Sequence, residues 1–247
     1  MIPAERLKLE TANDSLKDNF GGDQFPEPVL IDLDRLQREL AANLFDPAEY
    51  LDPRELATFQ GFKYQKRKVE WLGGRLAAKL AVLDLTGREP TAGAMRESLI
   101  SADQHGKPFL EAPAVPSEVS ISHSQGLALA MAVSNKACGL DIQKISAATV
   151  RVKEKFCTPA EEEIITSLDR AMPPPAALSL LWSSKEALRK ARGGHPLTGF
   201  TAMRLTAAVE AGAESWLLTM RAADDTYRIL TFFHKDFAMA ICLLPKP

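Results

Sequence analysis

Period-two alternation of apolar residues between positions 118 and 133 constrains the fold of this chain most strongly. Val119 and Ile121 precede a turn at Gln125-Gly126, after which apolar side chains alternate with alanines, and a further apolar run begins at Cys138. Such alternation is typical of strands with one buried face, and a short Gly-containing turn joins antiparallel neighbours. We therefore expect a three-stranded antiparallel meander.

A helical pattern precedes this region. Apolar residues recur every three or four positions over residues 69–83, which predicts a long amphipathic helix with Lys68, Arg75 and Lys79 on its exposed face. Gly73-Gly74 lies inside it, and each glycine costs about 1 kcal/mol relative to alanine in a helix. We expect another backbone, a ligand or closely packed side chains to approach there.

Helices and strands are expected in both halves of the chain. The expected helices span 34–43, 150–156, 159–168 and 176–191, and the expected strands span 29–33, 200–206, 216–221, 227–233 and 237–244. This pattern predicts an α+β fold of two subdomains, 1–137 and 138–247, with a cleft between them. The polar first two dozen residues are expected to form an extension, and we find no internal sequence repeat.

Composition excludes several classes of protein. The net charge of -2, from 30 basic and 32 acidic residues, argues against a dedicated nucleic-acid binder. Three cysteines without a C-x-x-C pair indicate neither a disulfide framework nor a zinc site, so we expect a reducing cytoplasm. The N-terminus lacks a signal-like apolar core, and the apolar run 127–133 is too short to span a bilayer, so no membrane role is expected.

Carboxylates and lysines occur in a pattern that suits phosphate chemistry. Asp141 and Gln143 lie two apart on a predicted strand and point to one face. Glu186 lies between Lys185 and Lys190 on a predicted helix. Mg2+ takes carboxylate oxygens while lysines neutralise phosphate oxygens, so this set suits a magnesium-dependent reaction on a polyphosphate. Alternatively, Asp141 is a turn or capping residue and Glu186 with Lys190 is a surface pair.

Two further segments contain candidate phosphate ligands. Ser122 and His123 lie at a predicted strand end before a turn, and Lys107 lies on a turn between Gly106 and Pro108. The chain lacks both the G-x-x-x-x-G-K-[ST] loop and the G-x-S-x-G elbow, which argues against a nucleotide phosphotransferase and a serine hydrolase. The alternatives are a hydrogen-bonded core or turn histidine and an ordinary surface lysine.

Taken together, five ordered segments carry a family resemblance. They are His105-Gly106-Lys107-Pro108, Ser120-Ile121-Ser122-His123-Ser124, Gly139-Leu140-Asp141-Ile142-Gln143, Phe156-Cys157-Thr158-Pro159 followed by Glu161 or Glu162, and Trp182-Ser183-Ser184-Lys185-Glu186-Ala187 with Lys190. In this order they resemble the Sfp-type 4'-phosphopantetheinyl transferases.

The resemblance implies a cytoplasmic, monomeric enzyme of two pseudo-symmetric α+β subdomains. Such an enzyme transfers 4'-phosphopantetheine from coenzyme A to a serine of an apo acyl, polyketide or peptidyl carrier protein. The reaction depends on Mg2+, with Mn2+ as a possible substitute, and releases adenosine 3',5'-bisphosphate. The alternative is a non-catalytic module that binds coenzyme A or a carrier protein.

The resemblance also implies roles for individual residues. Lys107, Ser122 and His123 would hold the 3'-phosphate region of coenzyme A, Asp141 and Glu186 the metal, and Lys185 and Lys190 the pyrophosphate, with Glu186 and Lys190 catalytic. Glu186 would be the base for the attacking serine. Gln143 departs from the family pattern, which has a second acid there, but its neutral carbonyl oxygen or a water could still serve as a metal ligand. The motifs leave open which of Arg54, Lys63, Arg67 and Arg75 contacts coenzyme A.

Overall fold

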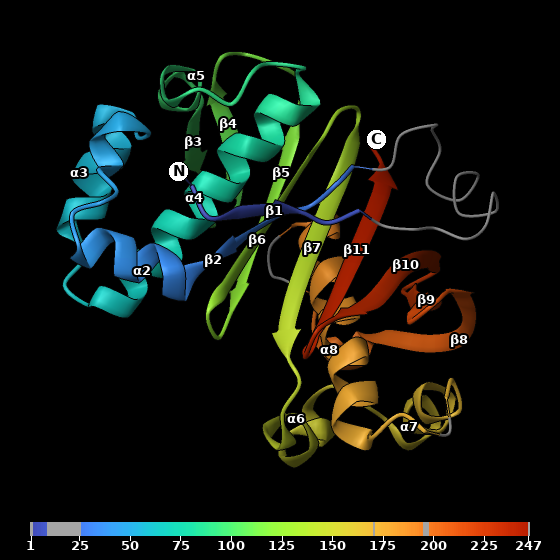
Figure 1. Cartoon of the computed structure of the whole chain (residues 1–247). Coiled ribbons are helices and arrows are strands. Elements are labelled where there is room, and N and C mark those ends of the chain that lie inside the picture. The colour runs from blue at the N-terminus through green and yellow to red at the C-terminus, as the bar shows by residue number, and fades with distance from the viewer. Residues whose placement is uncertain (1, 9–25, 170, 195–197, 247) are drawn as a thin grey trace. The chain divides into compact units, whose positions relative to one another are not determined.

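The computed structural model describes residues 2–8, 26–169, 171–194 and 198–246. These residues divide into two compact units, the first made of 2–8, 26–136 and 245–246 and the second of 137–244. Each unit combines helices with antiparallel strands, which confirms the α+β fold class (Figure 1). The boundary predicted at 137/138 lies beside this division, and most of the expected N-terminal extension falls outside the described residues.

In the first unit, the described helices precede the last four strands in chain order. In chain order its elements are β1 (Ala4–Arg6), β2 (Val29–Asp32), α2 (Leu33–Ala41), η1 (Pro47–Glu49), α3 (Pro53–Gly61), α4 (Gln65–Leu85), α5 (Ala92–Glu97), β3 (Leu99–Ala102), β4 (Pro108–Ala112), β5 (Glu118–Ser124) and β6 (Leu127–Val133). A four-stranded sheet has the order β1-β2-β6-β5, and β3 pairs with β4. The pairings are antiparallel.

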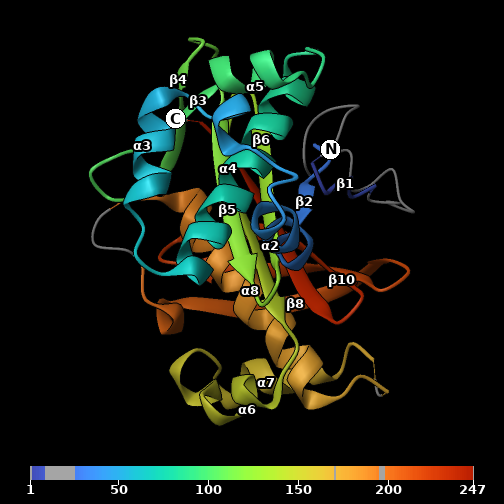
Figure 2. The same cartoon turned by 60° about the vertical axis from the view of Figure 1, so that its left-hand side comes forward.

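Helix α4 covers one face of the four-stranded sheet, where it contacts β2, β5 and β6 (Figure 2). Its two adjacent glycines permit this contact. A Cβ atom at Gly73 would lie 2.2 Å from Leu33 Cδ2, and one at Gly74 would lie 2.9 Å from Ile121 Cγ2. The close approach predicted at these glycines is therefore made by packed side chains.

Lys79 does not lie on the exposed face of α4, so that prediction is wrong. Its side chain is 0% exposed and its Nζ lies 2.6 Å from Glu55 Oε2. Lys79 lies three residues after Leu76 and four before Leu83, both fully buried, so it belongs to the apolar stripe that faces the core. Burial is tolerated because a buried carboxylate pairs with the ammonium group.

The hairpin of β5 and β6 has the expected form, with Ile121 opposite Ala130 and His123 opposite Ala128. The expected three-stranded meander is nevertheless wrong. The neighbours of β6 are β2 and β5, and the third strand, β7 (Lys136–Lys144), pairs with a strand of the other sheet. Both hydrogen-bonding edges of β6 are occupied, so β7 cannot join it.

The second unit is built on a five-stranded sheet. After β7 its elements are α6 (Ala147–Arg151), η2 (Lys153–Lys155), α7 (Pro159–Thr166), α8 (Pro174–Arg192), η3 (Phe200–Ala202), β8 (Met203–Gly212), β9 (Ser215–Ala222), β10 (Asp225–His234) and β11 (Phe237–Pro245). The strand order is β7-β11-β10-β9-β8. Helix α8 contacts β10, α6 and α7, so it forms the centre of this unit.

Local sequence explains where helices α7 and α8 of this unit begin. Thr158 caps α7, and the side chain of Glu161 accepts a hydrogen bond from the Thr158 N–H in a reciprocal capping box. Pro173 is the N-cap of α8 and Pro174 its first residue, a position where the missing N–H costs nothing. The helices predicted at 159–168 and 176–191 and the strands of this half occur with shifted ends, whereas the helix predicted over 150–156 is divided between the end of α6 and the 3-10 turn η2.

Candidate functional site

Asp141 lies on β7 where this strand packs directly against α8. The close packing depends on Gly139, because a Cβ atom there would lie 1.9 Å from the carbonyl oxygen of Ala187 and 2.6 Å from the amide nitrogen of Ala191. No side chain fits between the two backbones. Gly139 therefore brings the strand that carries Asp141 against the helix that carries Glu186.

Lys190 of α8 reaches β7 directly. Its Nζ donates to Asp141 Oδ1 at 2.8 Å and to the carbonyl oxygen of Leu140 at 2.8 Å. Asp141 is 6% exposed, so its carboxylate is held in a largely dry environment beside a cation. Asp141 is therefore an ion-pair partner of α8 rather than a helix cap or a turn residue.

Glu186 lies one helical turn before Lys190 and is close enough to Asp141 to be affected by its charge. Burial raises the pKa of the Glu186 carboxyl above its usual range, and the negative charge of Asp141 raises the pKa further. Arg189 opposes this effect, since its Nη2 lies 2.6 Å from Glu186 Oε2. A buried carboxylate whose pKa is raised beside a second carboxylate can bind a cation or accept a proton.

The donor set fits a hard divalent cation. Asp141 and Glu186 supply carboxylate oxygens, and Gln143 follows Asp141 on the same face of β7. The Gln143 Nε2 donates to the Lys144 carbonyl oxygen at 3.1 Å. Within the described parts of the chain, no three His, Cys, Asp or Glu residues are grouped to hold a metal. The metal-ligand roles of Asp141, Glu186 and Gln143 thus remain predictions.

Lys185 lies in the interior of the second unit. Its side chain is 0% exposed, and its Nζ lies 2.7 Å from Oε1 of Glu161, which is 2% exposed. In this arrangement the ammonium group is engaged within the protein. The predicted contact between Lys185 and pyrophosphate remains untested, but the structure provides a different partner.

The residues predicted to hold the 3'-phosphate of coenzyme A lie in the first unit. Ser122 and His123 are on β5, and His123 Nδ1 lies 3.9 Å from Glu70 Oε1. Lys107 instead pairs with Glu118 at the start of β5, with 2.8 Å between Nζ and Oε2. Five residues separate Glu118 from His123, or about 16 Å along a strand. Ser122 and His123 are adjacent on β5, so their side chains point to opposite faces of the strand, and Lys107 lies beside the start of that strand.

Comparison with known proteins finds a similarity over the second unit. The family model described as the 4'-phosphopantetheinyl transferase superfamily matches residues 137–242. This segment is similar to the superfamily. The matched segment contains β7 and α8, which bring Asp141, Glu186 and Lys190 to one place.

Two curated relatives are similar to this chain. Enterobactin synthase component D of Salmonella austin is 32% identical over 143 residues, which cover 58% of this chain and 55% of the relative. The protein of the same name from Salmonella typhi is 32% identical over 150 residues, covering 58% and 56%. The chain therefore spans little more than half the length of these curated relatives.

The sequence carried signals for two contacts that its motifs did not predict. Lys185 follows Leu181 by four residues and precedes Leu188 by three, so its row on α8 is otherwise apolar. Glu161 follows the pattern of a capping box, Thr-Pro-x-Glu, which ties a carboxylate to the start of a helix. These patterns indicate a buried lysine and an inward-pointing glutamate.

The described helices include none that combines the length and the apolar character required to cross a membrane.

Proposed function

We propose that this protein transfers 4'-phosphopantetheine from coenzyme A to a serine of an apo carrier protein and releases adenosine 3',5'-bisphosphate. The observation that carries the proposal is the proximity of Asp141, Glu186 and Lys190 within the segment that matches the superfamily. A hydroxyl that attacks a pyrophosphate needs a base and neutralisation of the phosphate charge. Two carboxylates and a cation are the groups that supply them.

Asp141 and Glu186 are the residues that would hold Mg2+ or Mn2+, with Gln143 as a third oxygen donor. A divalent cation bound there would neutralise charge on the pyrophosphate oxygens. Lys190, whose ammonium group lies 2.8 Å from the Asp141 carboxylate, supplies a second positive charge for the same oxygens. These roles follow from the chemistry of the donors.

Glu186 is the proposed general base. In the metal-free protein, burial and the charge of Asp141 raise the pKa of the Glu186 carboxyl, and a carboxylate with a raised pKa is a better proton acceptor than an exposed glutamate. It takes the proton from the serine hydroxyl of the carrier as the serine oxygen bonds to the β-phosphorus of coenzyme A. The bond from that phosphorus to the bridging oxygen breaks, and the electron pair leaves with adenosine 3',5'-bisphosphate. The step needs no covalent enzyme intermediate.

The contacts proposed for coenzyme A in the first unit are carried over from the family resemblance. Ser122 and His123 are proposed to bind its 3'-phosphate region, and we retain Lys107 as a candidate for a separate contact. The curated relatives are named as components of enterobactin synthase, so a carrier protein of a multienzyme synthase is the first substrate to test. We expect the protein to act as a monomer in the cytoplasm.

The direct test is intact-mass measurement of purified apo carriers of acyl, polyketide and peptidyl type, incubated with coenzyme A and Mg2+. We expect at least one carrier to gain one phosphopantetheinyl group, and we expect chelation of the metal to abolish the gain. Transfer that continues without a divalent metal would contradict the proposed site.

A non-catalytic module that binds coenzyme A or a carrier is the second candidate. The observation in its favour is Gln143, which replaces the second acid expected from the family resemblance. Binding of coenzyme A by calorimetry, with no mass gain in any carrier of the panel, would select this candidate over the transferase.

A further inference from the structure

The buried pair of Lys185 and Glu161 joins several elements of the second unit. The Lys185 ammonium group also donates to the carbonyl oxygens of Phe156 at 2.6 Å and Phe200 at 3.1 Å. Its three protons thus have three acceptors inside the protein. The Glu161 carboxylate in turn accepts from the Leu205 N–H of β8 at 2.8 Å, in addition to its capping contact at the start of α7.

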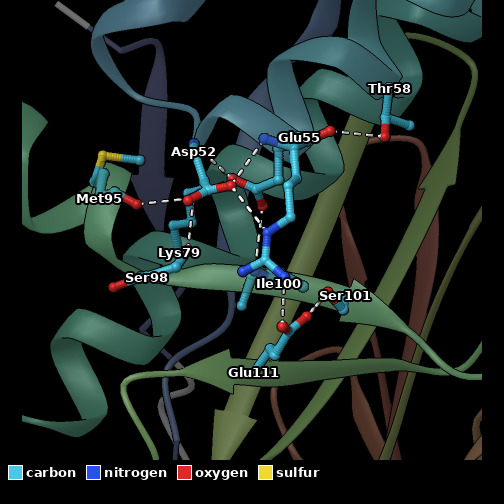
Figure 3. Close-up of polar contacts among 10 residues, drawn as sticks. Asp52, Glu55, Thr58, Lys79, Met95, Ser98, Ile100, Ser101 and Glu111 are labelled. Atoms are coloured by element: carbon cyan, nitrogen blue, oxygen red, sulfur yellow. Dashed lines mark hydrogen bonds and ion pairs between the residues drawn. The ribbon is translucent and has the colours of Figure 1, made fainter.

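The first unit contains a second pair with the same design (Figure 3). Lys79 and Glu55 are 0% and 3% exposed. The Lys79 ammonium group donates to the carbonyl oxygens of Met95 at 2.8 Å and Ser98 at 2.6 Å. The Glu55 carboxylate accepts from the Ile100 N–H of β3 at 3.2 Å.

The two pairs occupy corresponding places in their units. Glu55 and Glu161 are each the third residue of a helix that starts with proline and has a capping box. Lys79 and Lys185 are each in the interior of the long helix that follows. In both units the glutamate also accepts from the first strand after the long helix, β3 or β8. The sequence shows no repeat, yet the same buried connection is built twice.

The residues that follow the two lysines differ. Lys185 is followed by Glu186 and, five residues on, by Lys190, which pairs with Asp141. In the first unit, the corresponding residues are Leu80, which is buried, and Asp84, which pairs with Arg6. The buried Lys–Glu pair is therefore also present in a unit where it orients no comparable set of charged residues. We conclude that the pair serves to hold the long helix in place.

We propose that Lys185 and Glu161 are positioning residues that fix α8 against α7 and β8, so that Glu186 and Lys190 face Asp141. This inference rests on the proposed function. In this role Lys185 does not touch the pyrophosphate. A phosphate contact would require the ammonium group to leave Glu161 as an unpaired, buried carboxylate, which is strongly unfavourable.

The test uses matched lesions in the two units. Lys185→Met and Lys79→Met each remove a buried ammonium group and keep a flexible side chain of similar length. The double variants Lys185→Met/Glu161→Gln and Lys79→Met/Glu55→Gln also remove the carboxylate charge left unpaired. For each variant we would measure the thermal unfolding midpoint and its rise on addition of Mg2+. The KM for coenzyme A is measured at a temperature where the variant is folded.

We expect Lys185→Met and Lys79→Met to lower the unfolding midpoint similarly, and each double variant to recover most of the loss. The Mg2+ concentration for half-maximal stabilisation should rise about 10- to 100-fold in Lys185→Met. This is the usual loss of metal affinity when a residue that orients a metal ligand is removed. The concentration should stay within about twofold in Lys79→Met, because Lys79 contacts Glu55, Met95 and Ser98 rather than the proposed metal ligands. The double variant Lys185→Met/Glu161→Gln should return toward the wild-type requirement.

The proposal is overturned if Lys185→Met unfolds at the wild-type midpoint and only its KM for coenzyme A rises, since that result identifies a phosphate contact. It is also overturned if the double variant recovers its midpoint but remains as defective in Mg2+ response as Lys185→Met. If Lys185→Met does not fold, Glu161→Gln replaces it with the same expectations.

Failure of the proposed function gives a different result. Wild-type protein would then show neither transfer nor stabilisation by Mg2+, whereas the unfolding data would still report the coupling within each pair.

Discussion

Glu186 carries the largest share of the proposed chemistry at the scale of single residues. Replacing it with glutamine keeps its size but removes the base and one anionic metal ligand. We expect Glu186→Gln to lose at least the 10^2- to 10^4-fold in turnover that is typical when a general base is removed. The measurement is steady-state transfer, with circular dichroism to check folding.

Glu163→Gln is the matched control, because Glu163 is an exposed residue of α7. It should transfer at the wild-type rate. Near-normal turnover of a folded Glu186→Gln variant would mean that Glu186 is a structural partner of Arg189 and not the base.

Gln143 marks the point where the chain departs from the family pattern, and a magnesium titration reports its role. Gln143→Glu should lower the Mg2+ requirement through added Coulomb attraction, and Gln143→Ala should change it little, because a water can replace a neutral oxygen. Asp141→Ala should raise it strongly, since water supplies no charge. A Gln143→Ala defect as deep as that of Asp141→Ala would show that the amide is an essential ligand.

The sequence predicted that Glu186 could meet Asp141, and the structure pairs Lys190 of the same helix with Asp141. The roles of these residues in catalysis and metal binding remain predictions. The burial of Lys79 and Lys185 was not predicted, because the type of residue indicates an exposed or ligand-binding cation. Their buried partners lie far away in the sequence, so helical spacing alone did not identify them.

The contact between β7 and α8 is decisive at the scale of elements, and Gly139 tests it. A Cβ at this position would meet backbone atoms of α8, which cannot move aside as a side chain can. Gly139→Ala should therefore lower the free energy of unfolding by at least about 1–3 kcal/mol, the usual cost of overpacking. It should also impair transfer, because the strand of Asp141 is pushed away from Glu186.

Gly93→Ala is the control for Gly139→Ala, because nothing lies within 4 Å of a Cβ atom added in helix α5. It should be neutral or stabilise by up to about 1 kcal/mol. Chemical denaturation of the two variants is the measurement. Equal stability of Gly139→Ala and wild type would contradict the close packing of β7 on α8.

Element types were more predictable than their partners. Strong periodicity located α4, α8 and the strands of the second sheet, because burial of one face leaves a pattern in the sequence. The short strands β1, β3 and β4 lack enough residues for such a pattern. The misassignment of β7 has a different cause: alternation shows which face of a strand is buried but not which strand lies at its edge.

The cysteines test burial in the second unit, to which all three belong. Cys138 and Cys242 are 1% and 0% exposed, and burial raises the pKa of the Cys157 thiol from 9.0 to about 11. This higher pKa lowers the fraction of Cys157 that is present as thiolate at neutral pH about 100-fold. We expect the native protein to react slowly with a thiol reagent and the denatured protein to release three reactive thiols. A thiol that reacts in the native state at the denatured rate would reveal local opening.

We propose a metal-dependent phosphopantetheinyl transfer whose chemistry depends on Asp141 and Glu186. The most direct measurement is the intact mass of one apo carrier incubated with coenzyme A, Mg2+ and equal amounts of wild type, Asp141→Asn or Glu186→Gln. The account predicts that wild type adds one phosphopantetheinyl group and that both folded variants leave the carrier largely unmodified in the same time. Wild-type protein that leaves every carrier of the panel unmodified, or full modification of the carrier by either variant, would contradict it.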